Sequence, residues 1–133
     1  MTHLELSLEQ IEGAPWPAPS DDDSRMVRTA HALRQEPIGA LDAESLRLLI
    51  SQDIGLEVLV PRAVTLLREA PLAEGDYYPG DLLGSVLEVP VDFWARHEDM
   101  ATEVARIAAS VPPEDLFAPL PERIARFRAA VNR

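Results

Sequence analysis

The stretch PLAEGDYYPGDLLGSVLE, residues 71–88, decides how the rest of this chain folds. Pro71 is expected to end the helix before it, because its ring removes a backbone donor and clashes with the preceding turn. Pro79, Gly80 and Asp81 then predict a turn that leads into a new helix. The apolar positions of that helix follow helical spacing: Leu82, Leu83, Val86 and Leu87. The stretch is therefore predicted to begin as an exposed acidic loop between two helices.

The residue types of this loop fit two interpretations. In the first, the loop is an inter-helix connection whose acids are favoured near a helix start by the helix dipole, and whose tyrosines cover the edge of the core. In the second, it is a recognition surface. Tyr77 and Tyr78 would then anchor a partner, and carboxylates would face the partner's cations. The carboxylates in question belong to Glu74, Asp76 and Asp81.

Length and composition predict one domain, and the composition fits a reducing compartment. The 133 residues suffice for an ordinary core, so we expect a single domain spanning residues 1–133. The absence of cysteine excludes disulfides and thiolate metal sites. The start MTHLELSLEQ lacks the basic region of a signal peptide, and no apolar run approaches the ~20 residues that cross a bilayer. We expect a soluble cytoplasmic protein.

The charge of the chain limits its partners. The formal net charge of −11 argues against nucleic acid or an anionic membrane as a direct partner, because both are polyanions. Residues 1–24 carry six acids and no base, and residues 71–103 carry eight acids and one arginine. This distribution favours a basic protein partner.

The first third of the chain predicts short helices joined by an irregular arm. The leucines of residues 4–8 alternate as in a strand, yet Ser7 also fits a helix cap; with no second strand in sight, the helix is preferred. Residues 13–19, GAPWPAP, contain three prolines and predict an extended connector that Trp16 pins against the core. Ser20 is predicted to cap the next helix, with Asp21, Asp22 and Asp23 in its first turn.

Apolar spacings of three and four continue through the rest of the chain. Asp42 is a predicted helix cap, and Gly55 precedes a broad apolar face over residues 56–70, which we expect at the centre of the domain. Pro61 either kinks that helix or marks its start. Phe93 and Trp94 cannot both face inward on a short helix, so one is expected to cover a loop. With a final helix beginning near Pro121, the chain predicts an all-α domain of about six to eight short helices.

No motif for catalysis or phosphate binding occurs in the sequence. Two groups contain metal-ligand residue types, residues 21–23 and the run His97, Glu98 and Asp99. Neighbouring helical residues do not converge on one point, and helix-end roles explain both groups, with Asp99 as a predicted cap. We therefore predict no catalytic residue, no cofactor and no metal. A small hydrolase that uses buried carboxylates remains a third functional class. In that case metal or substrate would stabilise the purified protein.

Several segments taken in order resemble the immunity proteins of bacterial contact-dependent growth inhibition (CDI) systems. The resemblance covers roughly residues 8 to 96, and LAEGDYYPGDLL is its strongest match. The other segments are Pro15-Trp16, HALRQEPIGAL (31–41), SLRLLISQDIGLEVLVPRAV (45–64) and Phe93-Trp94. The resemblance implies a small cytoplasmic protein, expected to be monomeric when free. It would bind and neutralise the toxic C-terminal domain of a large secreted or surface effector.

Such toxin domains are often nucleases, which tend to be basic, and the acidity of this chain agrees with that role on independent grounds. The resemblance supplies no fixed binding residues. An acidic adaptor or regulatory subunit would have the same composition. The neighbouring gene separates the two classes, because a toxin gene directly upstream supports immunity and an enzyme operon supports the adaptor.

Overall fold

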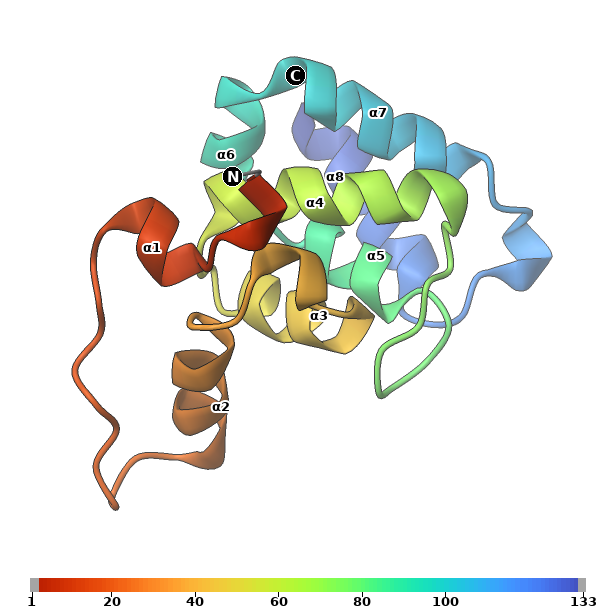
Figure 1. Cartoon of the computed structure of the whole chain (residues 1–133). Helices are drawn as coiled ribbons and strands as arrows, with labels where there is room; N and C mark the ends of the chain where they lie inside the picture. The colour runs from red at the N-terminus through yellow and green to blue at the C-terminus, as the bar shows by residue number, and fades with distance from the viewer. Residues whose placement is uncertain (1–2, 132–133) are drawn as a thin grey trace.

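The computed structural model describes residues 3–131, and these fold into helices joined by turns and loops (Figure 1). No β-strand occurs between residues 3 and 131, so the predicted all-α class is confirmed. The α-helices are α1 (Leu8–Glu12), α2 (Arg25–Leu33), α3 (Ala43–Ser51), α4 (Leu56–Glu69), α5 (Asp81–Leu87), α6 (Val91–Arg96), α7 (Glu98–Ala109) and α8 (Leu120–Val131). Three 3₁₀ turns are His3–Glu5, Ile38–Ala40 and Pro113–Asp115.

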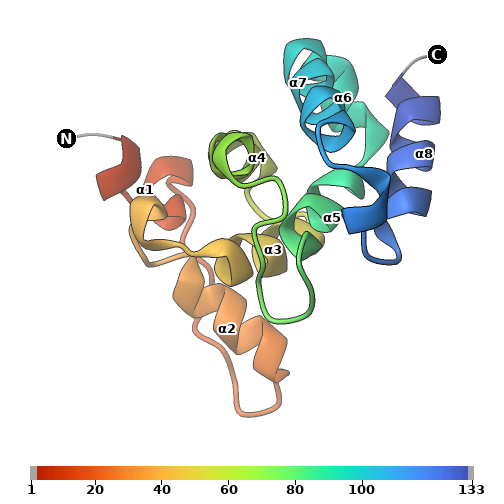
Figure 2. The same ribbon diagram turned by 90° about the vertical axis from the view of Figure 1, so that its right-hand side faces the viewer.

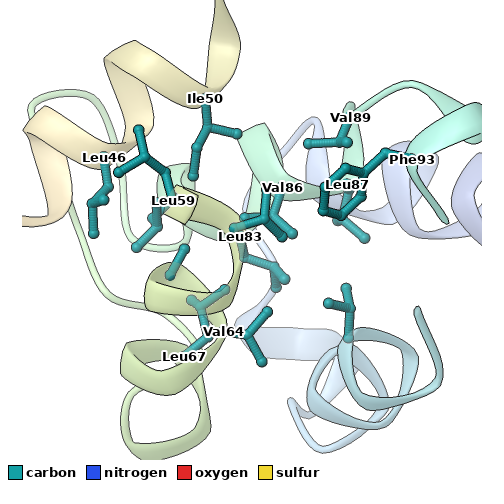
Figure 3. Close-up of a cluster of buried hydrophobic side chains, with 14 of the residues drawn as sticks. Leu46, Ile50, Leu59, Val64, Leu67, Leu83, Val86, Leu87, Val89 and Phe93 are labelled. Atoms are coloured by element: carbon teal, nitrogen blue, oxygen red, sulfur yellow. The ribbon is translucent and has the colours of Figure 1, made fainter. Parts of the chain in front are cut away.

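Helix α5 is the most buried element of the fold. All seven of its residues are buried, including the small residues Gly84 and Ser85 and the charged Asp81. Helices α3 and α4 pack against α5, and α8 packs against it as well (Figure 2). Figure 3 shows Leu83 and Val86 within the cluster of apolar side chains. Residues 56–70 were predicted to lie at the centre of the domain. Helix α4 keeps one side exposed to solvent, however, and α5 occupies the centre instead.

Local sequence rules set most helix ends. Ser7 caps α1 in a reciprocal capping box with Gln10, so the predicted helix is confirmed. Asp42 caps α3 as predicted, and its carboxylate accepts a hydrogen bond from the Ser45 amide at 2.8 Å. Helix α4 ends two residues before Pro71, as predicted. Pro61 lies inside α4, so it does not mark the start of that helix.

The predicted start of α2 was wrong. The cap is Ser24, whose hydroxyl accepts a hydrogen bond from the Val27 amide at 3.2 Å. Ser20 instead belongs to a turn: its amide donates to Asp23 Oδ2 at 2.8 Å, and its carbonyl accepts from the Asp23 amide at 3.1 Å. That turn ends before the helix begins, so the three aspartates precede α2 rather than form its first turn.

The predicted cap of α7 was also wrong. Asp99 lies in the first turn of α7, and the N-cap position belongs to His97, which makes no side-chain cap hydrogen bond. The His97 ring packs on Phe93, and its Nε2 lies 2.7 Å from Glu57 Oε2. An acid in the first turn is still favoured by the helix dipole.

The expectation that only one aromatic of α6 is buried was wrong. Phe93 is 2% exposed and Trp94 is 3% exposed. Both are covered because α6 packs against two helices, α7 and α8. Side chains that point in two different directions from the α6 axis can therefore both be buried in apolar surroundings. The two rings meet edge to face, with centroids 5.1 Å apart, and Trp94 meets Phe127 in the same way at 5.4 Å.

The irregular arm of residues 13–19 is held by a buried arginine. Arg34 is 2% exposed, and its Nη2 donates to Glu12 Oε1 at 2.6 Å and to the Ala14 carbonyl at 3.0 Å. The Trp16 ring lies over the Arg34 guanidinium at 4.4 Å and remains 36% exposed. Trp16 was predicted to pin the arm against the core; it pins the arm through a cation–π contact with Arg34 and is not among the residues packed on the apolar cluster.

Gly55 and Gly13 provide a matched test of packing at a left-handed residue. Both have positive φ, at 63° and 64°, but a Cβ on Gly55 would lie 2.5 Å from a Leu8 methyl, whereas a Cβ on Gly13 would meet nothing within 4 Å. We expect Gly13→Ala to cost about 1 kcal/mol from backbone strain. Gly55→Ala should cost about 1–3 kcal/mol more, because the buried Leu8 must shift.

Urea unfolding followed by circular dichroism measures both costs. Equal destabilisation by the two substitutions would contradict the packing of Leu8 against Gly55.

Candidate functional site

The loop that joins α4 to α5, residues 70–80, projects from one end of the molecule, where α2 also lies in both views (Figures 1 and 2). We call it the Tyr77 loop. Its two sides are linked, because the Gly80 amide donates to the Leu72 carbonyl at 3.1 Å, and Glu74 and Pro79 form an isolated β-bridge. The loop is therefore narrow and closed at its base.

The carboxylate of Asp81 organises this loop from the inside. Asp81 is the first residue of α5 and only 3% exposed. Its Oδ1 accepts a hydrogen bond from the Gly75 amide at 2.6 Å, and its Oδ2 accepts one from the Tyr77 amide at 3.0 Å. The expectation that Asp81 is a surface acid is therefore wrong, since both of its oxygens are occupied by backbone donors of the loop.

An ion pair on α3 supports the loop from the side. Glu44 and Arg47 form a bidentate pair, with Nε to Oε1 and Nη2 to Oε2 both at 2.6 Å. Glu44 Oε1 also accepts the Asp76 amide at 3.0 Å. A Cβ on Gly75 would lie 2.5 Å from Glu44 Oε1 and 3.1 Å from the Glu44 Cα, so only glycine lets the loop pass this close to α3.

The hydrogen bond from Arg47, followed by that from the Asp76 amide, lowers the pKa of Glu44 below its ordinary value of 4.5. The same pair raises the pKa of Arg47. Because the pKa of Glu44 is lower in the folded protein, its contribution to stability is fully present above pH 4.5 and is lost as the pH falls through the lowered value. The support of the loop thus persists at neutral pH.

Tyr77 stands at the tip of this arrangement. Its ring is 70% exposed, and the Arg47 guanidinium lies 4.6 Å from the ring centroid. Glu74 and Asp76 are exposed beside it. Tyr78 is half-buried, and its hydroxyl is covered without a hydrogen-bond partner among the described residues. The five residues predicted to bind a partner thus divide into three exposed at the loop surface and two, Tyr78 and Asp81, turned inward.

Two hollows flank Tyr77. One, of about 410 Å³, lies between α3, α5 and α8; we call it the α5 cleft, and Tyr78, Asp81 and Arg123 are among its lining residues. The other, of about 680 Å³, lies between α2, α3 and the Tyr77 loop; we call it the α2 groove. Tyr77 and Arg47 line both, so the tyrosine forms a ridge between two concave surfaces.

Sequence reasoning missed Glu44 and Arg47 as parts of this site. Their spacing of three residues indicates an ion pair on one helical face, but nothing local indicates that the pair meets a loop more than thirty residues away.

Metal-ligand residues do not cluster in the part of the chain that the structure describes: residues 3–131 contain no group of three or more histidines, cysteines and acids placed to hold an ion. Within the same residues no helix is both long and apolar enough to cross a membrane. His97, which the sequence placed in a possible ligand group, lies beside Glu57, and that glutamate also accepts a hydrogen bond from Arg96 at 3.0 Å.

Comparison with known protein families gives one decisive match. A family model described as CDI immunity proteins matches residues 10–104, which contain α2 to α6 and the whole Tyr77 loop. The chain belongs to this family. No curated protein and no solved structure matches it. The resemblance inferred from the sequence is confirmed. The region of this immunity protein that matches the family model ends before α8, the helix that covers one side of α5.

Asp81→Ala should uncouple the Tyr77 loop from α5. The substitution leaves the amides of Gly75 and Tyr77 without their acceptor, and each unsatisfied donor costs about 1–3 kcal/mol. We expect a loss of about 2–4 kcal/mol in the free energy of unfolding. Asp76→Ala, which removes an exposed carboxylate from the same loop, should change it by less than about 0.5 kcal/mol.

Urea unfolding of the two variants and the parent measures this difference. Equal stability of Asp81→Ala and Asp76→Ala would contradict the organising role of Asp81.

Proposed function

We propose that this immunity protein binds the toxic C-terminal domain of a CDI effector and neutralises it by stoichiometric binding, with the Tyr77 loop at the contact. The observation that carries the proposal is a large aromatic side chain, 70% exposed, on a loop whose backbone is hydrogen-bonded to Asp81 and Glu44. Exposed tyrosines that fill a partner's pocket are frequent binding hot spots.

The fixed backbone of the loop favours tight binding. Association must offset the entropy lost when loops and side chains become ordered at an interface. Here the amides of Gly75, Asp76 and Tyr77 already have acceptors within the protein, at 2.6 to 3.0 Å. The Tyr77 ring, moreover, already rests against Arg47. Little additional ordering of this loop is then required when a toxin domain docks.

The charge of the immunity protein favours a basic toxin domain. With a net charge of −11 and exposed Glu74 and Asp76 beside Tyr77, the surface attracts cations and repels polyanions. A nuclease fits this description, because it must itself attract nucleic acid. We place the interaction in the cytoplasm, with a free immunity protein that is monomeric, has no catalytic activity of its own, and contacts neither nucleic acid nor membrane.

Reversing the charge of the loop should slow association with the cognate toxin domain. Rim charges act mainly on the association rate, and salt weakens them as the Debye length falls from ~10 Å at 0.1 M to ~3 Å at 1 M. We expect the double variant Glu74→Lys, Asp76→Lys to associate about ten-fold more slowly at low salt. The double variant Glu114→Lys, Asp115→Lys makes the same charge change in the exposed turn before α8, and should have a smaller effect.

Stopped-flow association rates at several salt concentrations test this. If the two double variants associate at the same rate at low salt, the toxin does not approach the Tyr77 loop.

Removing the Tyr77 ring should mainly accelerate dissociation. A buried anchor worth about 1.4 kcal/mol or more corresponds to at least a ten-fold faster dissociation rate for Tyr77→Ala. Phe117→Ala provides the control, because Phe117 is another exposed aromatic, at 50%, that lies in the segment between α7 and α8. Its loss should leave the dissociation rate within about two-fold of the parent.

Surface plasmon resonance on folded variants, checked by circular dichroism, measures both rates. An unchanged dissociation rate for Tyr77→Ala would remove Tyr77 from the interface.

A further inference from the structure

The Tyr77 ring has one face against the protein and one face toward solvent. The Arg47 guanidinium lies 4.6 Å from the ring centroid and covers the first face. No other cation lies over this ring among residues 3–131, and the side chain is largely exposed. The loop that carries Tyr77 also projects from the body of the molecule (Figures 1 and 2). The face opposite Arg47 is therefore free to contact a partner.

The charge of Arg47 is balanced within the protein. Glu44 accepts two hydrogen bonds from the Arg47 guanidinium, both at 2.6 Å, in a bidentate pair. The π-system of an aromatic ring has a negative face, which attracts cations. Since Glu44 offsets the positive charge on one side of the Tyr77 ring, a second cation can approach the open side with little repulsion.

Asp76 supplies a carboxylate next to the open ring. It directly precedes Tyr77 in the loop, and the two residues line the α2 groove together. The Asp76 side chain is exposed. It forms no ion pair with Arg25, the other arginine of that lining besides Arg47, or with any other residue that the structure describes. A negative ring face and an unpaired carboxylate therefore stand side by side at the loop surface.

A guanidinium is the group that uses both features at once. It is planar, so it can stack on an aromatic ring while its N–H groups donate to a carboxylate, whereas an ammonium group is compact and strongly hydrated. The chain already contains this arrangement in its arm: Arg34 lies 4.4 Å from the Trp16 ring centroid and donates to Glu12 at 2.6 Å. The covered face of Tyr77 has the same arrangement.

We infer that an arginine of the toxin domain stacks on the open face of Tyr77 and pairs with Asp76, an inference that rests on the proposed function. The tyrosine then lies between two guanidinium groups, one from each protein. A cation–π contact is stronger where water is excluded, as it is at the centre of an interface. The contact therefore depends on the electron density of the ring face, and not only on the apolar area of the ring.

Two rings of nearly the same shape at position 77 test this dependence. Tyr77→Phe keeps the negative face of the ring. Trifluorophenylalanine in place of Tyr77 keeps the apolar ring, but its fluorine atoms withdraw the negative charge from the face. We expect Tyr77→Phe to bind the purified cognate toxin domain within about three-fold of the parent affinity. The fluorinated variant should bind about ten-fold more weakly than Tyr77→Phe, as measured by isothermal titration calorimetry.

Equal affinities of the phenylalanine and trifluorophenylalanine variants overturn the inference. If Tyr77→Ala weakens binding in that case, the ring is an apolar anchor without a cation on its face, and the proposed function still stands. A loss in Tyr77→Phe as large as that in Tyr77→Ala also overturns the inference, because the hydroxyl would then be the group in contact. If the parent protein does not bind the toxin domain, the proposed function itself fails.

Phe117 provides the matched control, because it is another exposed aromatic ring outside the Tyr77 loop. Trifluorophenylalanine in place of Phe117 should leave the affinity within about two-fold of the parent. An equal loss at positions 77 and 117 would overturn the inference, since fluorination would then act without regard to the Tyr77 contact.

A double-mutant cycle identifies the arginine on the toxin side. Each arginine of the toxin domain is changed in turn to glutamine and paired with the two ring variants at position 77 and with Asp76→Asn. For one toxin variant, fluorination of the ring and Asp76→Asn should each change the affinity by less than about two-fold, because the cation that both contact is absent. If no arginine of the toxin domain shows this coupling to position 77, the inference is wrong.

Discussion

The hydrogen bonds from the Gly75 and Tyr77 amides to the Asp81 carboxylate are the interaction on which the rest of this site depends. The two hydrogen bonds are 2.6 and 3.0 Å long, and Asp81, which accepts both, is only 3% exposed. A charged acceptor shielded from water holds its donors more firmly than a surface carboxylate does, and an unmade bond there is costly. The position of the Tyr77 ring is thereby linked to the first residue of α5.

Helix α5, in turn, is fixed by the core. Its seven buried residues pack against α3, α4 and α8, so the helix cannot shift without opening apolar contacts on several sides. Glycine makes the close approaches possible. At Gly80, with φ of 94°, a Cβ would lie 2.7 Å from Leu120, and a Cβ on Gly75 would lie 2.5 Å from Glu44 Oε1. The buried helix α5 therefore holds the exposed Tyr77 in a fixed position. Only a short stretch of loop separates the two in the sequence.

Much of the fold follows from local sequence rules, because local hydrogen bonds determine helix ends. Ser7 and Asp42 cap helices as predicted, and Pro71 and Gly80 bound the loop as predicted. Local rules failed where two serines could cap the same helix: the Ser20 amide donates to Asp23 Oδ2 in a turn before α2, and Ser24 is the cap.

Other features depend on tertiary contacts that no local pattern contains. Burial of both Phe93 and Trp94 requires two helices around α6, and the support of the loop by Glu44 joins positions far apart in the chain. Asp81 was recognised as important but assigned to the surface, because its type and its place at a helix start fit an exposed acid equally well.

Amide hydrogen exchange in the free immunity protein tests most directly whether the Tyr77 loop is held in place before any partner arrives. The amides of Gly75, Asp76 and Tyr77 all donate to buried or ion-paired carboxylates, so their exchange should be slowed at least about 100-fold relative to an unstructured peptide. The slowing at Gly75 and Tyr77 should disappear in Asp81→Ala. Exchange of these two amides at the unstructured rate in the parent protein would contradict the account, because the loop would then become ordered only on binding.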